Sequence, residues 1–386
     1  MKVLFATPFY FPEHKFGGPP RKIHAVACGL VKRGNNVLVL TFDSEHRDNG
    51  TRCKIDGVTV QYLRWAGGGL RQFPREWHVL SDALRGVQVV HGYGLYNFLC
   101  PAVALLACRQ DKPFVLEPLG MYPARLRNRL AKKLYNHIFT RWMSRRMAAA
   151  VAASEAEAHD LRQTADARKI LLRRNGVDVA AFSHLPSGEG LRARWRIRDD
   201  ERLVLFIGRL SPVKNLEQLI LAFEQAQLHE ARLVLVGPQS EAHYVETLRV
   251  LIAARQLDGR VVLAGPLYDD EQRAALGAAD LFVLPSLSES FGNAAAEAVA
   301  AGIPVLLTDT CGVAPMIHGR AGLAVPLGVE SIASGLQELL GDDNRCSELT
   351  AQRVEVVREL DWDAPIRQTE DLYIRLLRGE PVVPSP

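Results

Sequence analysis

Two glutamates, Glu289 and Glu297, stand in the densest group of polar and small residues in the chain, which reads PSLSESFGNAAAEA over 285–298. The group follows an apolar run typical of a buried strand, and its alanine-rich part predicts a helix. Glu297 is the one acid in a predicted helix otherwise made of Ala and Val. A solvent-exposed helix face is therefore a poor explanation for an acid at this position. Its carboxylate can accept hydrogen bonds from ligand hydroxyls. Glu289 precedes the helix, where a carboxylate could instead serve only the helix dipole.

Arg209 and Lys214 form a second group, between an apolar run at 203–207 and a predicted helix at 215–225. Ligands collect at the carboxyl ends of strands in parallel sheets. A guanidinium can hold two oxygens, an ammonium supplies a point charge, and the following helix N-terminus adds backbone donors. The spacing therefore predicts a diphosphate site, with a surface loop carrying two solvated cations as the alternative.

Gly17 and Gly18 follow the first predicted strand, 3–6, and precede a predicted helix at 21–32. Paired glycines let a backbone approach a ligand closely, although a tight turn explains them equally well. Neither GxGxxG nor a Walker A pattern occurs in the chain, which disfavours a dinucleotide-dependent dehydrogenase and a P-loop kinase.

Short apolar runs without polar alternation recur along the chain and are separated by helical stretches. Such runs predict parallel strands covered on both faces, and the series restarts after residue 190, which indicates an α/β chain with two doubly wound domains. We expect these domains at 1–185 and 186–360. A final helix and tail, 361–386, should pack back toward the N-terminal domain, and 175–200 is predicted to be a linker.

Composition and charge narrow the function classes. Hydrophobic residues make up 48% and charged residues 23% of the chain, which excludes a disordered, collagenous or coiled-coil protein. No apolar run approaches the roughly 20 residues of a membrane-spanning helix. Residues 1–190 contain 28 Lys and Arg against 15 Asp and Glu, whereas residues 191–386 contain 19 against 28. This split indicates an anionic partner for the first half.

The segment 121–150 concentrates this positive charge and contains no acid. Its cations are Arg125, Arg127, Arg129, Lys132, Lys133, Arg141, Arg145 and Arg146. Apolar residues recur every four positions at Leu126, Leu130, Leu134, Ile138 and Trp142. Such a helix can lie on an anionic membrane, and a core-packed helix with a solvated basic surface is an alternative of equal weight. Nucleic acid is disfavoured, because no aromatic platform or binding motif accompanies the charge.

Metal-binding motifs are weak in this sequence. The six cysteines form no C-x-x-C pair, so reduced, mostly buried thiols are expected. The only Asp-x-Asp, at 361–363, immediately precedes the last predicted helix, where acids stabilise a helix start. We therefore predict no metal and no cofactor. The first residues predict a strand and not a secretory signal.

Together these motifs resemble those of the retaining glycosyltransferases of the GT-B fold, family 4. Glu289 and Glu297 match the E-x7-E motif of that family, and Gly208-Arg209 with Lys214-Asn215 matches its G-R-x-x-x-x-K-N segment. The paired glycines match its N-terminal glycine loop, and the resemblance covers nearly the whole chain. It implies two Rossmann-like doubly wound domains that face each other across a cleft.

The resemblance also implies roles for individual residues. Arg209 and Lys214 would hold the donor diphosphate and stabilise the leaving nucleoside diphosphate, while Glu289 would contact the donor sugar and Glu297 the ribose. Further donor contacts would come from Gly17, Gly18, Ser290, Phe291, Gly292 and Asn293.

The chain departs from the family pattern on the acceptor side. Leu119-Gly120 stands where the family often has His-Gly, and Tyr93 stands at a second frequent histidine position. His91, Tyr93 and Glu117 are therefore the candidates for contacts with the acceptor.

The expected activity is that of a metal-independent retaining glycosyltransferase, which moves a sugar from a nucleoside-diphosphate-sugar to an acceptor hydroxyl. A basic N-terminal domain fits a lipid-linked or growing glycan in cell-surface polysaccharide synthesis. We expect the protein in the cytoplasm, peripherally bound at the inner face of the plasma membrane. Two alternatives remain: a nucleotide-sugar epimerase of the same fold, and a non-catalytic protein that binds nucleotide-sugars.

Overall fold

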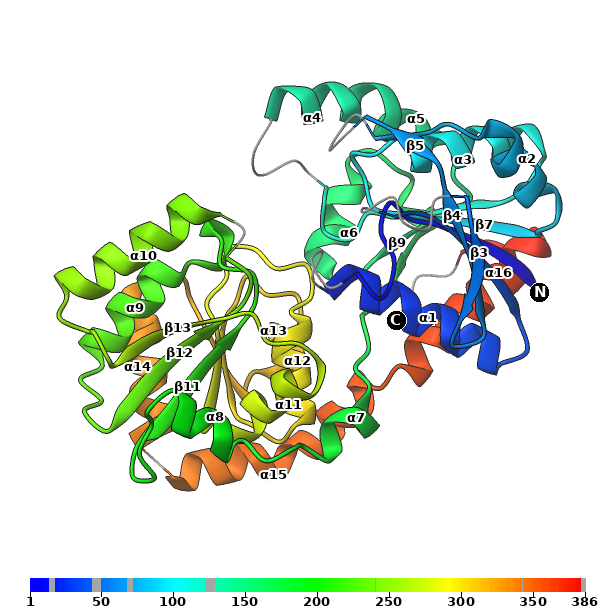
Figure 1. Cartoon of the computed structure of the whole chain (residues 1–386). Coiled ribbons are helices and arrows are strands. Elements are labelled where there is room, and N and C mark those ends of the chain that lie inside the picture. Colours follow the sequence, from blue (N-terminus) through cyan, green and yellow to red (C-terminus); the bar gives the residue numbers. More distant parts are fainter. Residues whose placement is uncertain are drawn as a thin grey trace. The chain divides into compact units, whose positions relative to one another are not determined.

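The computed structural model describes residues 1–13, 18–43, 50–67, 72–122, 129–239, 241–341 and 343–382. The chain divides into two compact units (Figure 1). Unit 1 comprises Met1–Asn175 with Trp362–Pro386, and unit 2 comprises Gly176–Asp361. The first boundary thus precedes the position expected after residue 185.

Unit 1 is built on an eight-stranded sheet of order β10-β9-β8-β7-β1-β2-β4-β3. All neighbours pair in parallel except β3 and β4, which form an antiparallel hairpin that sequence reasoning missed. The strands are β1 Lys2–Ala6, β2 Asn36–Phe42, β3 Arg52–Ile55, β4 Val58–Leu63, β7 Val89–Tyr93, β8 Phe114–Glu117, β9 Ala149–Ala152 and β10 Ile170–Leu172. A separate two-stranded sheet pairs β5 Trp65–Ala66 with β6 Phe73–Pro74.

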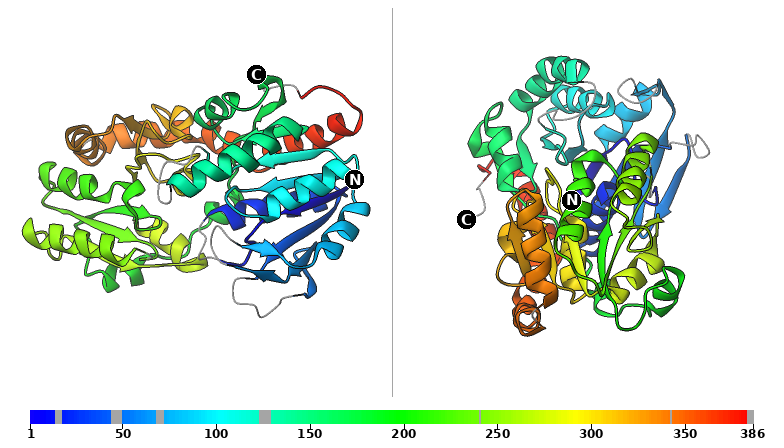
Figure 2. Two further views of the ribbon diagram at one scale, coloured as in Figure 1. Left: turned by 90° about the horizontal axis from the view of Figure 1, so that it is seen from above. Right: turned by 90° about the vertical axis from the view of Figure 1, so that its left-hand side faces the viewer.

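Successive side chains of these strands point to opposite faces of the sheet and pack into two apolar cores, one on each face. Helices α2, α3, α5 and α6 pack on one face, and α1 and α16 on the other (Figures 1 and 2). The helical segments are α1 Gly18–Lys32, α2 Trp77–Arg85, α3 Leu99–Arg109, α4 Arg129–Tyr135, the π-helix Asn136–Thr140, α5 Arg141–Arg146, α6 Glu155–Arg162, the 3₁₀ turn Ala167–Lys169 and α16 Asp363–Leu377. The end of the chain therefore completes the core of the first unit.

Unit 2 is built on a six-stranded parallel sheet of order β13-β12-β11-β14-β15-β16. Its strands are β11 Arg202–Ile207, β12 Ala231–Val236, β13 Val261–Gly265, β14 Leu281–Leu284, β15 Val305–Thr308 and β16 Gly322–Val325. Its helical segments are α7 Val179–Ser183, α8 Glu189–Arg194, the 3₁₀ turn Pro212–Lys214, α9 Leu216–Gln225, α10 Ala242–Ala254, α11 Asp269–Ala278, α12 Asn293–Ala300, α13 Ala314–Ile317, α14 Val329–Gly341 and α15 Asp343–Leu360.

The parallel sheet of unit 2 and the largely parallel sheet of unit 1 confirm the predicted α/β fold with two doubly wound domains. In unit 2 the strand order reverses between β11 and β14, which is where ligands bind in open sheets of this kind. The segment 175–200 is not a bare linker. It contains α7 and α8, and Leu191 and Trp195 are buried, so this segment contributes to the packing of unit 2. No helix in the described parts of the chain has the length and apolar character needed to cross a bilayer.

Candidate functional site

The turn after β11 is held at the carboxyl edge of the unit 2 sheet by a close approach of two glycines. The N–H of Gly208 donates to the carbonyl of Val236 at 2.9 Å. A Cβ on Gly237, whose φ is +156°, would lie 1.8 Å from the carbonyl oxygen of Gly208. Only glycine fits there. The side chain of Arg209, the next residue along the chain from Gly208, is exposed.

Lys214 and Glu289, 75 residues apart in the sequence, meet at this edge. Lys214 ends the 3₁₀ turn before α9, and its ammonium donates to a carboxylate oxygen of Glu289. Their side chains are 17% and 21% exposed, so the pair is shielded from water but not enclosed. The N–H of Leu287 donates to the carbonyl of Val213 at 2.9 Å, which fastens the two loops together.

The loop that carries Glu289 is anchored on both sides of that residue. Its carbonyl accepts from the N–H of Gly312 at 3.0 Å, and the carbonyl of Phe291 accepts from the N–H of Val313 at 2.7 Å. The Phe291 side chain is 1% exposed, so it anchors the loop in the core. Phe291 is predicted to contact the donor, and because its side chain is buried, only its backbone is suited to that contact.

Helix α12 begins at the end of this loop. Gly292 precedes it in the left-handed region, with φ 106° and ψ 53°, and no side chain caps the helix among the described residues. The first intrahelical bond runs from the N–H of Ala296 to the carbonyl of Gly292, at 3.1 Å. Asn293 begins the first turn of α12, and Ser290, three residues earlier, is half-buried. The N–H groups of a first helical turn are suited to binding an anion.

Glu297 lies about one turn into α12 and is half-buried. One of its carboxylate oxygens accepts from the side-chain amide of Gln272 at 3.1 Å. Gln272 belongs to α11, and sequence reasoning missed it, because nothing in the motif around Glu297 indicates which helix packs against it.

The acceptor-side candidates lie at the carboxyl ends of β7 and β8 in unit 1. His91, Tyr93 and Glu117 all have no exposed surface. The His91 ring stacks on Tyr93, with centroids 4.1 Å apart and planes at 15°, and its Nδ1 lies 2.6 Å from the hydroxyl of Tyr373 on α16. The structure thus brings these residues together, but inside unit 1.

Glu117 is the centre of a buried ionic cluster, which comprises Glu117, Lys22, Arg173 and His91. Nη2 of Arg173 donates to both carboxylate oxygens at 2.9 Å, and the ammonium of Lys22, on α1, forms a further ion pair with the same carboxylate. Nε2 of His91 lies 3.6 Å from it. Nη1 of Arg173 donates to Thr369 of α16 at 3.1 Å, so the cluster ties both helices to the sheet.

Burial and neighbouring charges have opposing effects on the pKa values of these groups. Burial alone would raise the pKa of Glu117, but the charges of Arg173 and Lys22 outweigh it and hold that pKa below its usual value. Burial lowers the pKa of Lys22, and Glu117 opposes that change. Burial also lowers the pKa of His91, to about 3, so its imidazole is neutral at physiological pH. Lys22 and Arg173 were missed from the sequence, where they look like surface cations.

Acid should destabilise unit 1 through His91. The folded imidazole has a pKa of about 3, against an ordinary value of 6.5. Between these values the unfolded chain binds more protons, so the free energy of unfolding should rise with pH up to about pH 6.5, by at most about 1.4 kcal/mol per pH unit. Urea unfolding at several pH values should show a shallower slope for His91→Gln than for wild type. His78→Gln, at an exposed position of α2, should keep the wild-type slope; equal slopes for all three proteins would contradict the assignment.

The loop after β8 carries Leu119 in place of the family histidine. Leu119 and Gly120 both have positive φ, 59° and 73°. The N–H of Gly120 donates to one carboxylate oxygen of buried Glu157 at 2.6 Å, and the N–H of Ala153 donates to the other at 2.8 Å. Leu119 is half-buried against the core. Glu157 lies in the first turn of α6, and its carboxylate therefore fixes the loop after β8. The sequence did not indicate this role.

Gly18 is the first residue of α1, while Gly17 lies outside the described residues. The basic segment is described from residue 129 onward, so Arg125 and Arg127 also lie outside. Within the described part, Leu130, Leu134 and Ile138 are 84%, 61% and 48% exposed. This part of the apolar ladder faces solvent, which contradicts the core-packed alternative for these positions.

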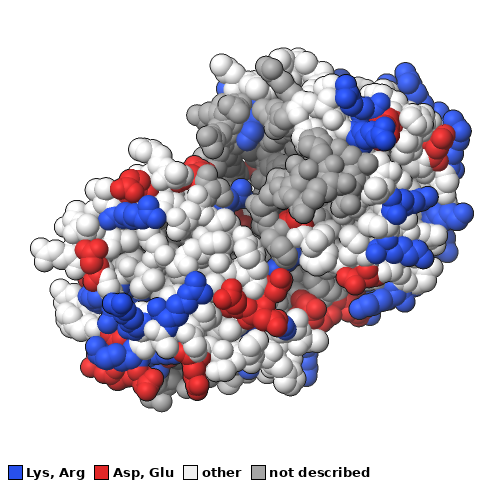
Figure 3. Space-filling view, viewed as in Figure 1, with Lys and Arg blue, Asp and Glu red and all other residues white. Residues whose placement is uncertain are grey.

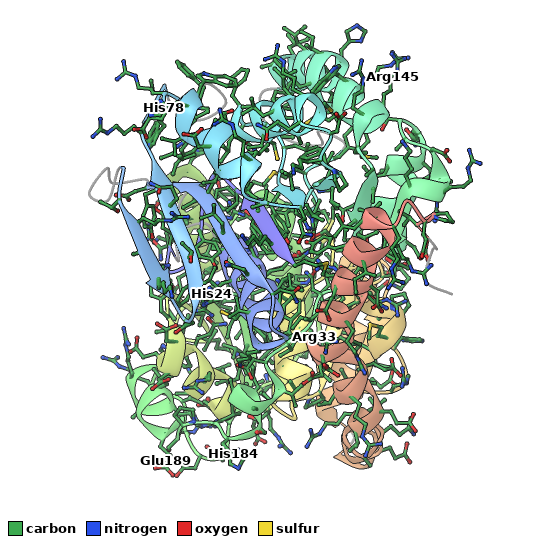
Figure 4. All side chains as sticks on the ribbon, turned by 90° about the vertical axis from the view of Figure 1, so that its right-hand side faces the viewer. His24, Arg33, His78, Arg145, His184 and Glu189 are labelled. Atoms are coloured by element: carbon green, nitrogen blue, oxygen red, sulfur yellow. The ribbon has the colours of Figure 1, made fainter. Side chains whose placement is uncertain are left out.

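Exposed cations accompany this apolar surface. They are Lys133, Arg141, Arg145 and Arg146. Arg145 is labelled on the surface of α5 in Figure 4. Figure 3 shows more Lys and Arg than Asp and Glu on the side of unit 1 that is in view.

Two family matches cover most of the chain. Residues 189–354 match the family described as glycosyl transferases group 1, and residues 17–176 match the glycosyl transferase 4-like domain.

Relatives match over nearly the full length. An uncharacterized glycosyltransferase of Methanocaldococcus jannaschii is 26% identical over 97% of this chain and 98% of that protein. The GDP-mannose:cellobiosyl-diphosphopolyprenol alpha-mannosyltransferase of Xanthomonas oryzae pv. oryzae is 26% identical over 97% and 96%. The fold matches sucrose-phosphate synthase of Thermosynechococcus elongatus, with a TM-score of 0.79, 21% identity, and 98% and 100% of the two chains covered. It also matches Anabaena HepE in complex with UDP-glucose, with a TM-score of 0.79, 19% identity, and 98% and 100% covered.

Proposed function

We propose that this chain is a glycosyltransferase of the GT-B type, which transfers a sugar, with retention of anomeric configuration, from a nucleoside-diphosphate-sugar to an acceptor hydroxyl. The observation that carries the proposal is the Lys214–Glu289 pair at the carboxyl edge of the unit 2 sheet. A cation, a carboxylate and the start of α12 come together there, which suits a ligand with a diphosphate at one end and hydroxyls at the other.

On binding, the donor diphosphate would replace the Glu289 carboxylate as the partner of the Lys214 ammonium. Arg209, Lys214 and the first N–H groups of α12 would then carry the charge that develops on the leaving group. The released carboxylate of Glu289 can accept hydrogen bonds from the donor sugar, and Glu297 from the ribose. Because protein cations and N–H groups supply this stabilisation, we expect transfer without a metal ion, which a chelator should leave unchanged.

The transfer step involves one bond broken and one formed. The bond from the anomeric carbon to the diphosphate oxygen breaks, and the acceptor oxygen bonds to the same carbon on the same face. The acceptor proton passes to an oxygen of the leaving phosphate. Retention follows from this same-face attack.

A thermal-shift panel tests donor binding in the full chain. It should include UDP, GDP and their glucose and mannose conjugates, because UDP-glucose is bound to the HepE structure and GDP-mannose is named for the relative from Xanthomonas. At a hundredfold excess over its Kd a ligand stabilises the folded protein by about 2.7 kcal/mol. One nucleotide-sugar should raise the Tm of wild type and of Arg249→Ala, a surface control on α10, but not of Lys214→Ala or Glu297→Ala. No shift with any ligand would contradict the proposed donor site.

We propose a lipid-linked or growing glycan as the acceptor, held at an anionic membrane by the basic segment of unit 1. Three exposed apolar side chains with cations around them favour a bilayer surface, because the apolar groups enter the interface while the cations pair with lipid phosphates. The acceptor in the name of the Xanthomonas relative, a cellobiosyl-diphosphopolyprenol, is a lipid of this kind. We propose that the protein works at the inner face of the plasma membrane in polysaccharide synthesis.

Vesicle sedimentation tests the membrane proposal. Leu134→Ser should weaken binding to vesicles containing anionic lipid about tenfold or more, since burial of a leucine contributes about 1.5–3 kcal/mol. Neutralising Arg125, Arg127 and Arg129 together should weaken binding further, and added salt should reduce it. Val250→Ser, at a 61% exposed position of unit 2, is the matched control. Wild-type binding by the Leu134 and arginine variants would exclude this segment as the membrane surface.

A further inference from the structure

A histidine, a cysteine and an aspartate gather on the surface of unit 1. His24 and Cys28 lie four residues apart on one face of α1, and Asp56 comes from the tight turn between β3 and β4. His24 is labelled beside these strands in Figure 4. Asp56 and Gly57 have positive φ, 47° and 83°, as an Asp-Gly hairpin turn requires, and this turn places the Asp56 carboxylate over α1.

Two of the three spacings between the ligand atoms are close to those of a tetrahedral metal site. Nε2 of His24 lies 2.9 Å from Oδ2 of Asp56 and 3.4 Å from Sγ of Cys28. All three atoms lie within 4.8 Å of one another. Zinc bonds of ordinary length impose edges of about 3.3 Å between nitrogen and oxygen and about 3.5 Å between nitrogen and sulfur. Sγ of Cys28 also lies 3.7 Å from Nδ1 of His24, so the sulfur now sits over the imidazole ring. Binding a common ion therefore requires the Cys28 side chain to rotate toward the Nε2 side of the ring.

The second nitrogen of His24 is already held in the way that metal-binding histidines are held. Its Nδ1 lies 2.8 Å from the hydroxyl of Tyr10, which is 2% exposed, so this hydroxyl fixes the ring orientation. Phe11 stacks on the imidazole, with centroids 4.4 Å apart and planes at 9°. The ring is thus oriented with Nε2 toward the Asp56 carboxylate.

Contrary to the expectation of no metal from the sequence, we propose that His24, Cys28 and Asp56 bind one zinc ion, with a fourth position left for water. Nitrogen, sulfur and oxygen ligands in this combination suit zinc better than the all-oxygen sets that magnesium and calcium prefer. As the sulfur binds the ion, the Cys28 thiol releases its proton to solvent. The ion joins α1 to the β3–β4 hairpin, and α1 also carries Lys22 of the buried ionic cluster. The proposal does not depend on the proposed transferase function.

Cobalt substitution tests the site, because cobalt bound to a thiolate gives a charge-transfer absorption band that other ligands do not. The metal-free full chain should take up about one cobalt ion with this band, and added zinc should abolish it. Cys28→Ser should lose the band, and Asp56→Asn should bind cobalt at least about tenfold more weakly. Asp56 is 70% exposed, and asparagine tolerates its backbone conformation, so this variant should fold normally.

Cys53→Ser is the matched control, because Cys53 is an exposed thiol in the same hairpin. It should keep the band and the wild-type stoichiometry. The proposal would be overturned by the absence of a band in wild type, or by a band that survives Cys28→Ser and disappears in Cys53→Ser.

Discussion

Glu117→Gln should lower the free energy of unfolding of unit 1 by about 3–5 kcal/mol, the usual cost of removing one partner from a buried ion pair. The substitution hardly changes side-chain volume but leaves Lys22 and Arg173 without a carboxylate. Lys22 is 5% and Arg173 0% exposed, so water cannot replace the lost partner. The desolvation cost of both cations remains, whereas the attraction that offset it is gone.

Urea unfolding followed by tryptophan fluorescence measures this effect. Four of the five tryptophans lie in unit 1, so the signal reports mainly on that unit. Arg168→Gln is the control, because it breaks the exposed pair of Arg168 with Asp166, whose side chains are 88% and 40% exposed. This variant should unfold like wild type. If Glu117→Gln also unfolded like wild type, the cluster would not be what holds α1 and α16 to the sheet.

Lys214→Ala should lower kcat/KM for sugar transfer by about 10²–10³-fold, as loss of a group that stabilises developing charge does in other enzymes. It should also weaken binding of the nucleoside diphosphate product, because the same cation holds the diphosphate. Steady-state kinetics with the donor found in the panel, together with product inhibition, measure both effects. Lys214→Arg keeps the charge and should lose less activity than the alanine variant.

Glu289→Gln, compared with Lys214→Ala and with the double variant, distinguishes the contributions of Glu289 and Lys214 to kcat/KM. Because Lys214 and Glu289 are in direct contact, their effects should not be additive, and the double variant should lose less than the product of the single losses. Arg249→Ala, a surface substitution in the same unit, should retain wild-type kcat/KM. Full activity in Lys214→Ala would exclude this lysine from the transfer step.

The sequence by itself determined most of the elements of the two parallel arrays and the order in which they follow each other. The run 281–284 was predicted as a strand and is β14, and the predicted helix after it is α12. The helix predicted at 215–225 is α9, Leu216–Gln225. These predictions rest on local patterns. An apolar run without polar alternation predicts a parallel strand that is buried on both faces. The loop that follows such a strand lies at the carboxyl end of the strand. The sequence therefore also indicated which motifs would lie at the carboxyl edge of the unit 2 sheet.

Only the tertiary structure decided which side chains meet. Lys22, Glu117 and Arg173 come from α1, β8 and the segment after β10, and Tyr373 lies 282 residues from its partner His91. Asp56 reaches His24 only because an unpredicted hairpin turns toward α1. The periodicity of a helix or strand shows which face is apolar, but not which element covers it. A lysine or arginine in one segment therefore reads as a surface cation until packing buries it against a carboxylate from another.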